Sequence, residues 1–155
     1  MRLRTRATVA AVAFLAAPLA SAEVSLQNAW LRPAAAGQPS AMVYVDIESS
    51  EALKLVGARS PVAKRAQLVI VDPPGPQAPQ KVVGEIDVRP NMPRRLAYLG
   101  SHVRLVDIQN DLVPGTRVPL ELEFVDAKGK RIAVPVEADV RGITVRPPQP
   151  AESPK

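Results

Sequence analysis

The stretch from Val118 to Val125 reads VPLELEFV, and along it apolar residues alternate with proline or glutamate. Apolar residues at every second position lie on one face of a β-strand, because successive side chains of a strand point to opposite sides. Residues 131–140 repeat this alternation less cleanly, and Lys128-Gly129 between the two runs is a typical turn sequence. The segment therefore predicts two antiparallel strands joined as a hairpin, with one apolar face.

Seven further runs of strand length precede this hairpin, and turn residues separate them. Helical spacing is scarce, and the 17 prolines of the chain leave little room for long helices. Eight or nine short strands with this spacing predict an all-β, antiparallel sandwich or barrel. Pro119 and Pro135 lie inside two of the runs, so those strands are predicted to be edge strands or to be bulged there. The seven further runs span residues 24–32, 41–48, 53–58, 66–72, 81–88, 95–99 and 102–108.

The two ends of the chain have compositions that differ from the middle. Residues 1–22 combine three early arginines, an apolar run over 9–20 and the small residues Ala20-Ser21-Ala22. This layout predicts a secretory signal peptide cleaved after Ala22, with an apolar run too short to span a bilayer. We therefore predict export to a periplasm, one domain over residues 23–145 that does not span the membrane, and a disordered Pro-rich tail over 146–155.

The charge balance excludes a nucleic-acid partner. The whole chain carries 20 basic and 15 acidic residues, but cleavage after Ala22 removes three arginines and lowers the net charge from +5 to +2. The remaining chain has four aromatic residues, too few to interleave with a basic stripe. The absence of cysteine also excludes disulfides, cysteine nucleophiles and thiolate metal sites.

No arrangement of residues predicts an enzyme. Ser101 and His102 are neighbours, but adjacent residues of a strand point to opposite faces and do not form a nucleophile–base pair. Glu121 and Glu123 share a strand face, which we interpret as a solvated face rather than a glycosidase pair. The phosphate-binding, dinucleotide-binding and zinc-peptidase motifs are all missing from the sequence.

Several short pieces of the chain form a recognisable set in their order along it. They are NAWLR at 28–32, AMVY at 41–44, LVGA at 55–58, SPVA at 60–63, GSHVRLVDI at 100–108, LVPG at 112–115 and VPLELEF at 118–124. In this order they resemble the PCu(A)C family of periplasmic copper chaperones. The resemblance covers about residues 24–140 and implies a cupredoxin-like Greek-key barrel that carries copper to cytochrome oxidase.

Copper ligands in that family follow the spacing H-x10-M-x21-H-x-M. This chain can be aligned with that spacing without a gap, but it has a family ligand at only one of the four positions. When the single histidine, His102, is aligned with the third ligand, the other three positions are Val69, Gln80 and Arg104. Valine has no donor atom, glutamine offers only a hard oxygen, and a fixed guanidinium charge opposes a cation. The resemblance thus implies a degenerate copper site.

Two methionines are the remaining candidates for soft ligands. Met42 lies in an apolar run and is predicted to fill the core. Met92 lies in the predicted loop RPNMP at 89–93 and is a candidate second ligand beside His102.

Two functions follow from the degenerate site. The first is an exported binding or assembly module with a degraded copper site and no resident cofactor, whose protein partners by resemblance are copper-assembly factors of cytochrome oxidase. The alternative is a copper chaperone that binds copper at low affinity through His102 and non-family ligands and delivers it to cytochrome oxidase.

Overall fold

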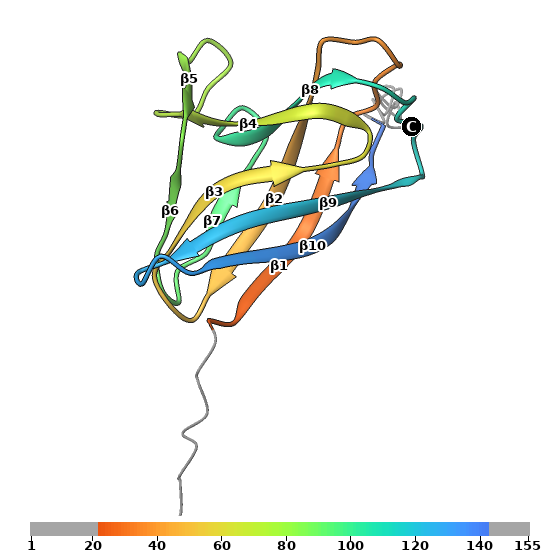
Figure 1. The fold of residues 1–155 in the computed structure, drawn as a ribbon. Coiled ribbons are helices and arrows are strands. Elements are labelled where there is room, and N and C mark those ends of the chain that lie inside the picture. Colours follow the sequence, from red (N-terminus) through yellow and green to blue (C-terminus); the bar gives the residue numbers. More distant parts are fainter. Residues whose placement is uncertain (1–21, 143–155) are drawn as a thin grey trace, which may run out of the picture.

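A computed structural model describes residues 22–142, which form ten strands joined by turns and loops. Nine strands follow one path of neighbours, β5-β4-β8-β2-β1-β10-β9-β3-β6, and β7 pairs with β2 beside this path. The sheet curls into a barrel, and β5 lies at the end opposite residue 22 (Figure 1). The strands are β1 (Val24–Leu31), β2 (Ser40–Ser49), β3 (Leu53–Arg59), β4 (Ala63–Val71), β5 (Gln80–Val83), β6 (Ile86–Val88), β7 (Arg94–Leu96), β8 (His102–Ile108), β9 (Arg117–Asp126) and β10 (Arg131–Val140).

The predicted all-β barrel is confirmed, with two corrections in detail. The run predicted over 81–88 is two strands, β5 and β6, because the chain leaves β4 at Gly84-Glu85 and continues beside β3. The first and last strands, β1 and β10, pair in parallel at Trp30 and Leu31, whereas every pairing was predicted to be antiparallel. The predicted signal peptide and tail lie outside the described residues, apart from Ala22.

Pro119 and Pro135 lie where their strands have a neighbour on one side only. Strand β9 pairs with β3 only from Glu121 onward, and β10 pairs with β1 only at its last two residues. Neither strand is an edge of the sheet, but each proline, which lacks an N–H group, lies in a singly paired stretch.

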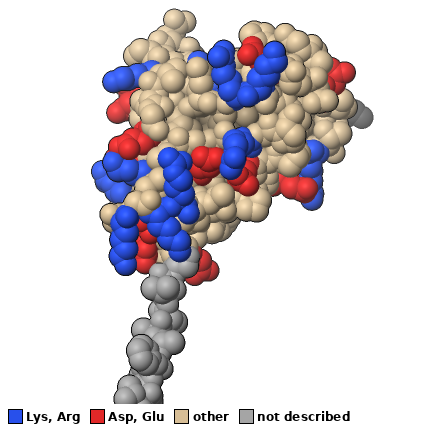
Figure 2. Space-filling model, in the orientation of Figure 1, with Lys and Arg blue, Asp and Glu red and all other residues tan. Residues whose placement is uncertain are grey.

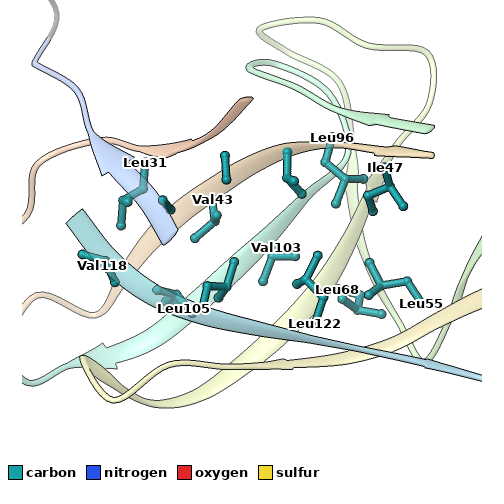
Figure 3. Close-up of a cluster of buried hydrophobic side chains, with 14 of the residues drawn as sticks. Leu31, Val43, Ile47, Leu55, Leu68, Leu96, Val103, Leu105, Val118 and Leu122 are labelled. Atoms are coloured by element: carbon teal, nitrogen blue, oxygen red, sulfur yellow. The ribbon is translucent and has the colours of Figure 1, made fainter. Parts of the chain in front are cut away.

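The core lies inside the barrel and is built from the inward face of each strand (Figure 3). Strand β8 shows the alternation of inward and outward side chains most clearly. Val103 and Leu105 are buried in the core, while His102 and Arg104 point to the outer face. The outer face of β8 therefore carries the candidate site.

On the face of the molecule that Figure 2 shows, basic and acidic side chains lie beside one another. Glu121 and Glu123 of β9 both pair with Arg59, at 2.5 and 2.7 Å, so their shared strand face is an ion-paired one. Exposed pairs of this kind contribute little to stability.

Candidate functional site

The register of three strands brings the four family positions to one face of the sheet. Val69 of β4 lies directly opposite His102 of β8, and Arg104 follows His102 on the same face. Gln80 lies opposite Val71 of β4, two residues beyond Val69, and so shares that face. Because the guanidinium of Arg104 donates a hydrogen bond to Oε1 of Gln80, these two side chains are in direct contact.

His102 is buried although it points away from the core. Only 2% of its surface is exposed, and its Nδ1 lies 2.8 Å from the carbonyl oxygen of Gly100. A carbonyl oxygen only accepts, so Nδ1 carries the hydrogen and the neutral ring keeps a lone pair on Nε2. Within residues 22–142 this buried Nε2 has no hydrogen-bond partner.

The pKa of His102 is lowered from its ordinary value. Burial is the main cause, because it disfavours the charged ring, and the positive charge of Arg104 acts in the same direction. The hydrogen bond with the Gly100 carbonyl opposes both. The imidazole is therefore neutral at physiological pH and presents Nε2 as an acceptor.

Two loops cover the outer face at His102 and account for its burial. Gly75 donates its N–H to the Leu99 carbonyl at 2.9 Å, which ties the loop after β4 to the turn before β8. Leu99 has a φ of 61°, and a Cβ on Gly100 would lie 3.3 Å from the Ala97 carbonyl oxygen. This tight turn directs the Gly100 carbonyl toward His102.

Ser101 takes part in the same loop contact rather than in a catalytic pair. Its hydroxyl oxygen accepts the N–H of Val71 at 3.2 Å, while Nδ1 of His102 is engaged by Gly100.

A cavity of about 220 Å³ lies beneath these loops, and His102 forms part of its wall. Tyr44 stands beside His102, with ring centroids 6.3 Å apart, and its hydroxyl donates to the sulfur of Met42 at 3.5 Å. Burial raises the pKa of Tyr44, so the phenol is protonated and available as a donor. The lining residues are Arg32, Met42, Tyr44, Val71, Gly75, Pro76, Gln80, Tyr98, Leu99, Gly100 and His102.

Met42 does not lie in the core, and Met92 lies in its predicted loop but away from His102. The prediction that Met42 fills the core is wrong, because its neighbours Val43 and Ala41 are the inward residues of β2 and Met42 opposes Arg104 on the outer face. Met92 is 54% exposed and lines a different depression, next to Ile70 and Arg94. The structure therefore places Met42, not Met92, in the cavity of His102.

Sequence reasoning also missed Tyr44 and Arg32 as site residues. The signal was present in the alternation of β2, since Val43, Val45 and Ile47 on the inner face put Met42 and Tyr44 on the outer one. Met42 had instead been assigned to the core, and the covering loops make this outer face a cavity.

The cavity has positive charges at its margin and few hard ligands. The guanidinium of Arg32 lies 5.5 Å from the ring centre of Tyr98, and Arg104 contacts Gln80. Across residues 22–142, no three side chains among histidine, cysteine, aspartate and glutamate are grouped so as to hold a metal ion. The family's four-ligand copper cage does not fit the residues present at Val69, Gln80 and Arg104, and the donors left are one imidazole nitrogen, one thioether sulfur and neutral oxygens.

Comparison with solved structures confirms the resemblance in fold. The copper-bound PCuAC domain from PmoF2 superposes with a TM-score of 0.60 at 23% identity, over 77% of this chain and 92% of that domain. The Cu(I) form of DR1885 from Deinococcus radiodurans gives a TM-score of 0.54 at 23% identity, over 83% of this chain and 81% of that protein. At this identity the likeness establishes the cupredoxin-like fold and no more.

Sequence comparison places the chain in a family. A curated relative, "Putative lipoprotein Lxx21020" of Leifsonia xyli subsp. xyli, is 29% identical over 115 residues, which cover 74% of this chain and 69% of the relative. Within residues 22–142 there is no helix with the length and hydropathy needed to cross a lipid bilayer. The family model described as "Putative lipoprotein LpqE-like" matches residues 24–136, the whole barrel except the end of its last strand. The chain therefore belongs to the LpqE-like lipoprotein family, built on the fold of PCuAC domains.

Proposed function

We propose that this chain is an exported copper-handling module of the cell envelope that binds copper weakly through His102, without the four-ligand cage. The observation that carries the proposal is the buried Nε2 of His102, which has no hydrogen-bond partner among residues 22–142, in a residue that lines a cavity. A buried acceptor without a partner is costly, so its retention points to a ligand that completes it. Imidazole nitrogen suits both oxidation states of copper.

Two features support weak rather than tight binding. Three of the four family positions hold valine, glutamine and arginine, which supply no soft donor. Arg104 also places a positive charge near His102, which helps to lower the pKa of that ring and would oppose a bound cation. Copper held in this way is readily passed on to a partner.

A competition titration tests this function. The purified protein is titrated with Cu(I) against a chelator under reducing conditions, and we expect one equivalent to bind. The substitution His102→Ala is expected to weaken binding by at least about tenfold, because a metal ligand is lost. Lack of Cu(I) binding in the unsubstituted protein would contradict the proposal.

A non-metal binding or assembly module is the second candidate, and the arginines favour it. Arg32 lines the cavity and Arg104 contacts the lining residue Gln80, and both offer planar donor forks suited to an acidic partner. By family resemblance, such partners are copper-assembly factors of cytochrome oxidase in the periplasm. The titration separates the two candidates, because this module requires no copper.

The lipoprotein description of the family applies to this chain with one qualification. It supports export to the cell envelope, in agreement with the predicted signal peptide. The 155 residues contain no cysteine, so none of them offers a thiol for a thioether-linked lipid. The family description alone therefore does not assign a lipid anchor to this chain.

A further inference from the structure

The cavity of His102 is lined both by a residue with a nitrogen donor and by one with a sulfur donor. His102 is 2% exposed, its Nδ1–H is engaged by the Gly100 carbonyl, and its Nε2 has no partner among the described residues. An imidazole whose one nitrogen is held by a carbonyl is arranged as metal-ligating histidines usually are, because the hydrogen bond sets the tautomer and orients the ring.

Met42 lines the same cavity and is held in place from strand β2. Met42 lies directly opposite Arg104 of β8, which places its side chain on the outer face. His102, two residues before Arg104 on the same face of β8, is therefore its diagonal neighbour and lines the same cavity. The hydroxyl of Tyr44 donates to the sulfur of Met42 at 3.5 Å. A thioether sulfur has two lone pairs, so this hydrogen bond leaves one of them free to bind a soft metal.

We infer that the cavity is a soft-metal site in which Nε2 of His102 and the sulfur of Met42 bind Cu(I). This inference rests on the proposed function and names its second ligand, at a position outside the family's ligand spacing. Tyr44 is a positioning residue, because it orients the sulfur without itself binding the metal.

The surroundings select a monovalent soft ion over divalent ones. None of the lining residues is an aspartate or glutamate, the ligands that hard divalent cations need, and Arg32 lies at the margin. Divalent ions meet twice the repulsion that Cu(I) meets from each arginine. At about 220 Å³ the cavity also leaves room for a third ligand from a partner, which copper transfer requires.

The test compares Met42→Leu with Met92→Leu as its matched control. Leucine and methionine have similar volumes, so both variants should fold, and only the first removes sulfur from the cavity. We expect Met42→Leu to weaken Cu(I) binding by at least about tenfold in the chelator titration and to abolish copper–sulfur scattering in X-ray absorption. The Met92→Leu variant should match the unsubstituted protein in both.

A measurement on the unsubstituted protein tests the inference even if the Met42→Leu variant does not fold. With methionine methyl groups labelled with ¹³C, Cu(I) should shift the Met42 signal and leave the Met92 signal in place. The Met92→Leu variant assigns the two signals by removing one. Tyr44→Phe should weaken Cu(I) binding by a smaller factor than Met42→Leu, since it removes only the hydrogen bond to sulfur.

The outcomes separate this inference from the proposed function. If His102→Ala loses copper while Met42→Leu binds it as tightly as the unsubstituted protein, the methionine ligand is wrong and the function stands. If the unsubstituted protein binds no Cu(I), both are wrong. Loss of affinity in both variants, with the Met42 methyl shifted by Cu(I), supports both.

Discussion

Replacing Gln80 and Arg104 together by methionine is expected to raise the Cu(I) affinity by about a thousandfold, or about 4 kcal/mol. The side chains of Gln80 and Arg104 already contact each other, and Arg104 follows His102 on one face of β8. The double substitution therefore puts two soft sulfur atoms beside the His102 nitrogen. It also removes a positive charge that would oppose a bound cation.

The measurement is the same chelator competition, with a control that adds sulfur elsewhere. Lys64→Met with Lys81→Met places two methionines at exposed positions, and Lys81 lies on the face of β5 opposite to Gln80. This control should bind Cu(I) as the unsubstituted protein does. Equal affinity in the Gln80/Arg104 variant and the control would show that the four family positions do not converge as described.

The second large effect concerns the core rather than the site. Phe124→Ala is expected to lower the free energy of unfolding by about 3–5 kcal/mol, because a fully buried ring on β9 is lost and leaves a cavity. Small domains are stable by only about 5–15 kcal/mol, so the loss is a large part of the total. Urea unfolding followed by Trp30 fluorescence measures it.

Two comparisons make the Phe124 result specific. Phe124→Leu should recover much of the loss because it refills part of the space. Val113→Ala, at a position 51% exposed, should change stability by less than about 0.5 kcal/mol. A loss in Phe124→Ala no larger than that in Val113→Ala would contradict the core described for the barrel.

The strands could be predicted from the sequence because the alternation of apolar and polar residues is a local property. The runs predicted over 102–108 and 131–140 match β8 and β10 residue for residue, since period-2 spacing shows directly in the sequence. The division of 81–88 into β5 and β6 was not readable, because β5 pairs with β4 and β6 with β3. Pairing partners depend on segments distant in the chain.

The residues of the candidate site were likewise predicted from the sequence only in part. The family spacing found His102 and its three altered neighbours, which the register then placed on one face. Met92 was chosen as the second soft residue because it lies in a predicted loop, although that side chain lines another depression. Met42 had been assigned to the core because its run is apolar on both faces.

By itself, the sequence predicted an all-β barrel and excluded cysteine chemistry, because these depend on alternation and composition, and it placed Val69, Gln80 and Arg104 at ligand positions of the family that it resembles. Only the tertiary structure decided that loops cover the outer face at His102 and that Met42 and Tyr44 share its cavity. The reason is that burial of an outward-facing side chain depends on the loops that cross over it. The hydrogen bonds from Gly75 to Leu99 and from Val71 to Ser101 join residues 24 and 30 positions apart in the chain.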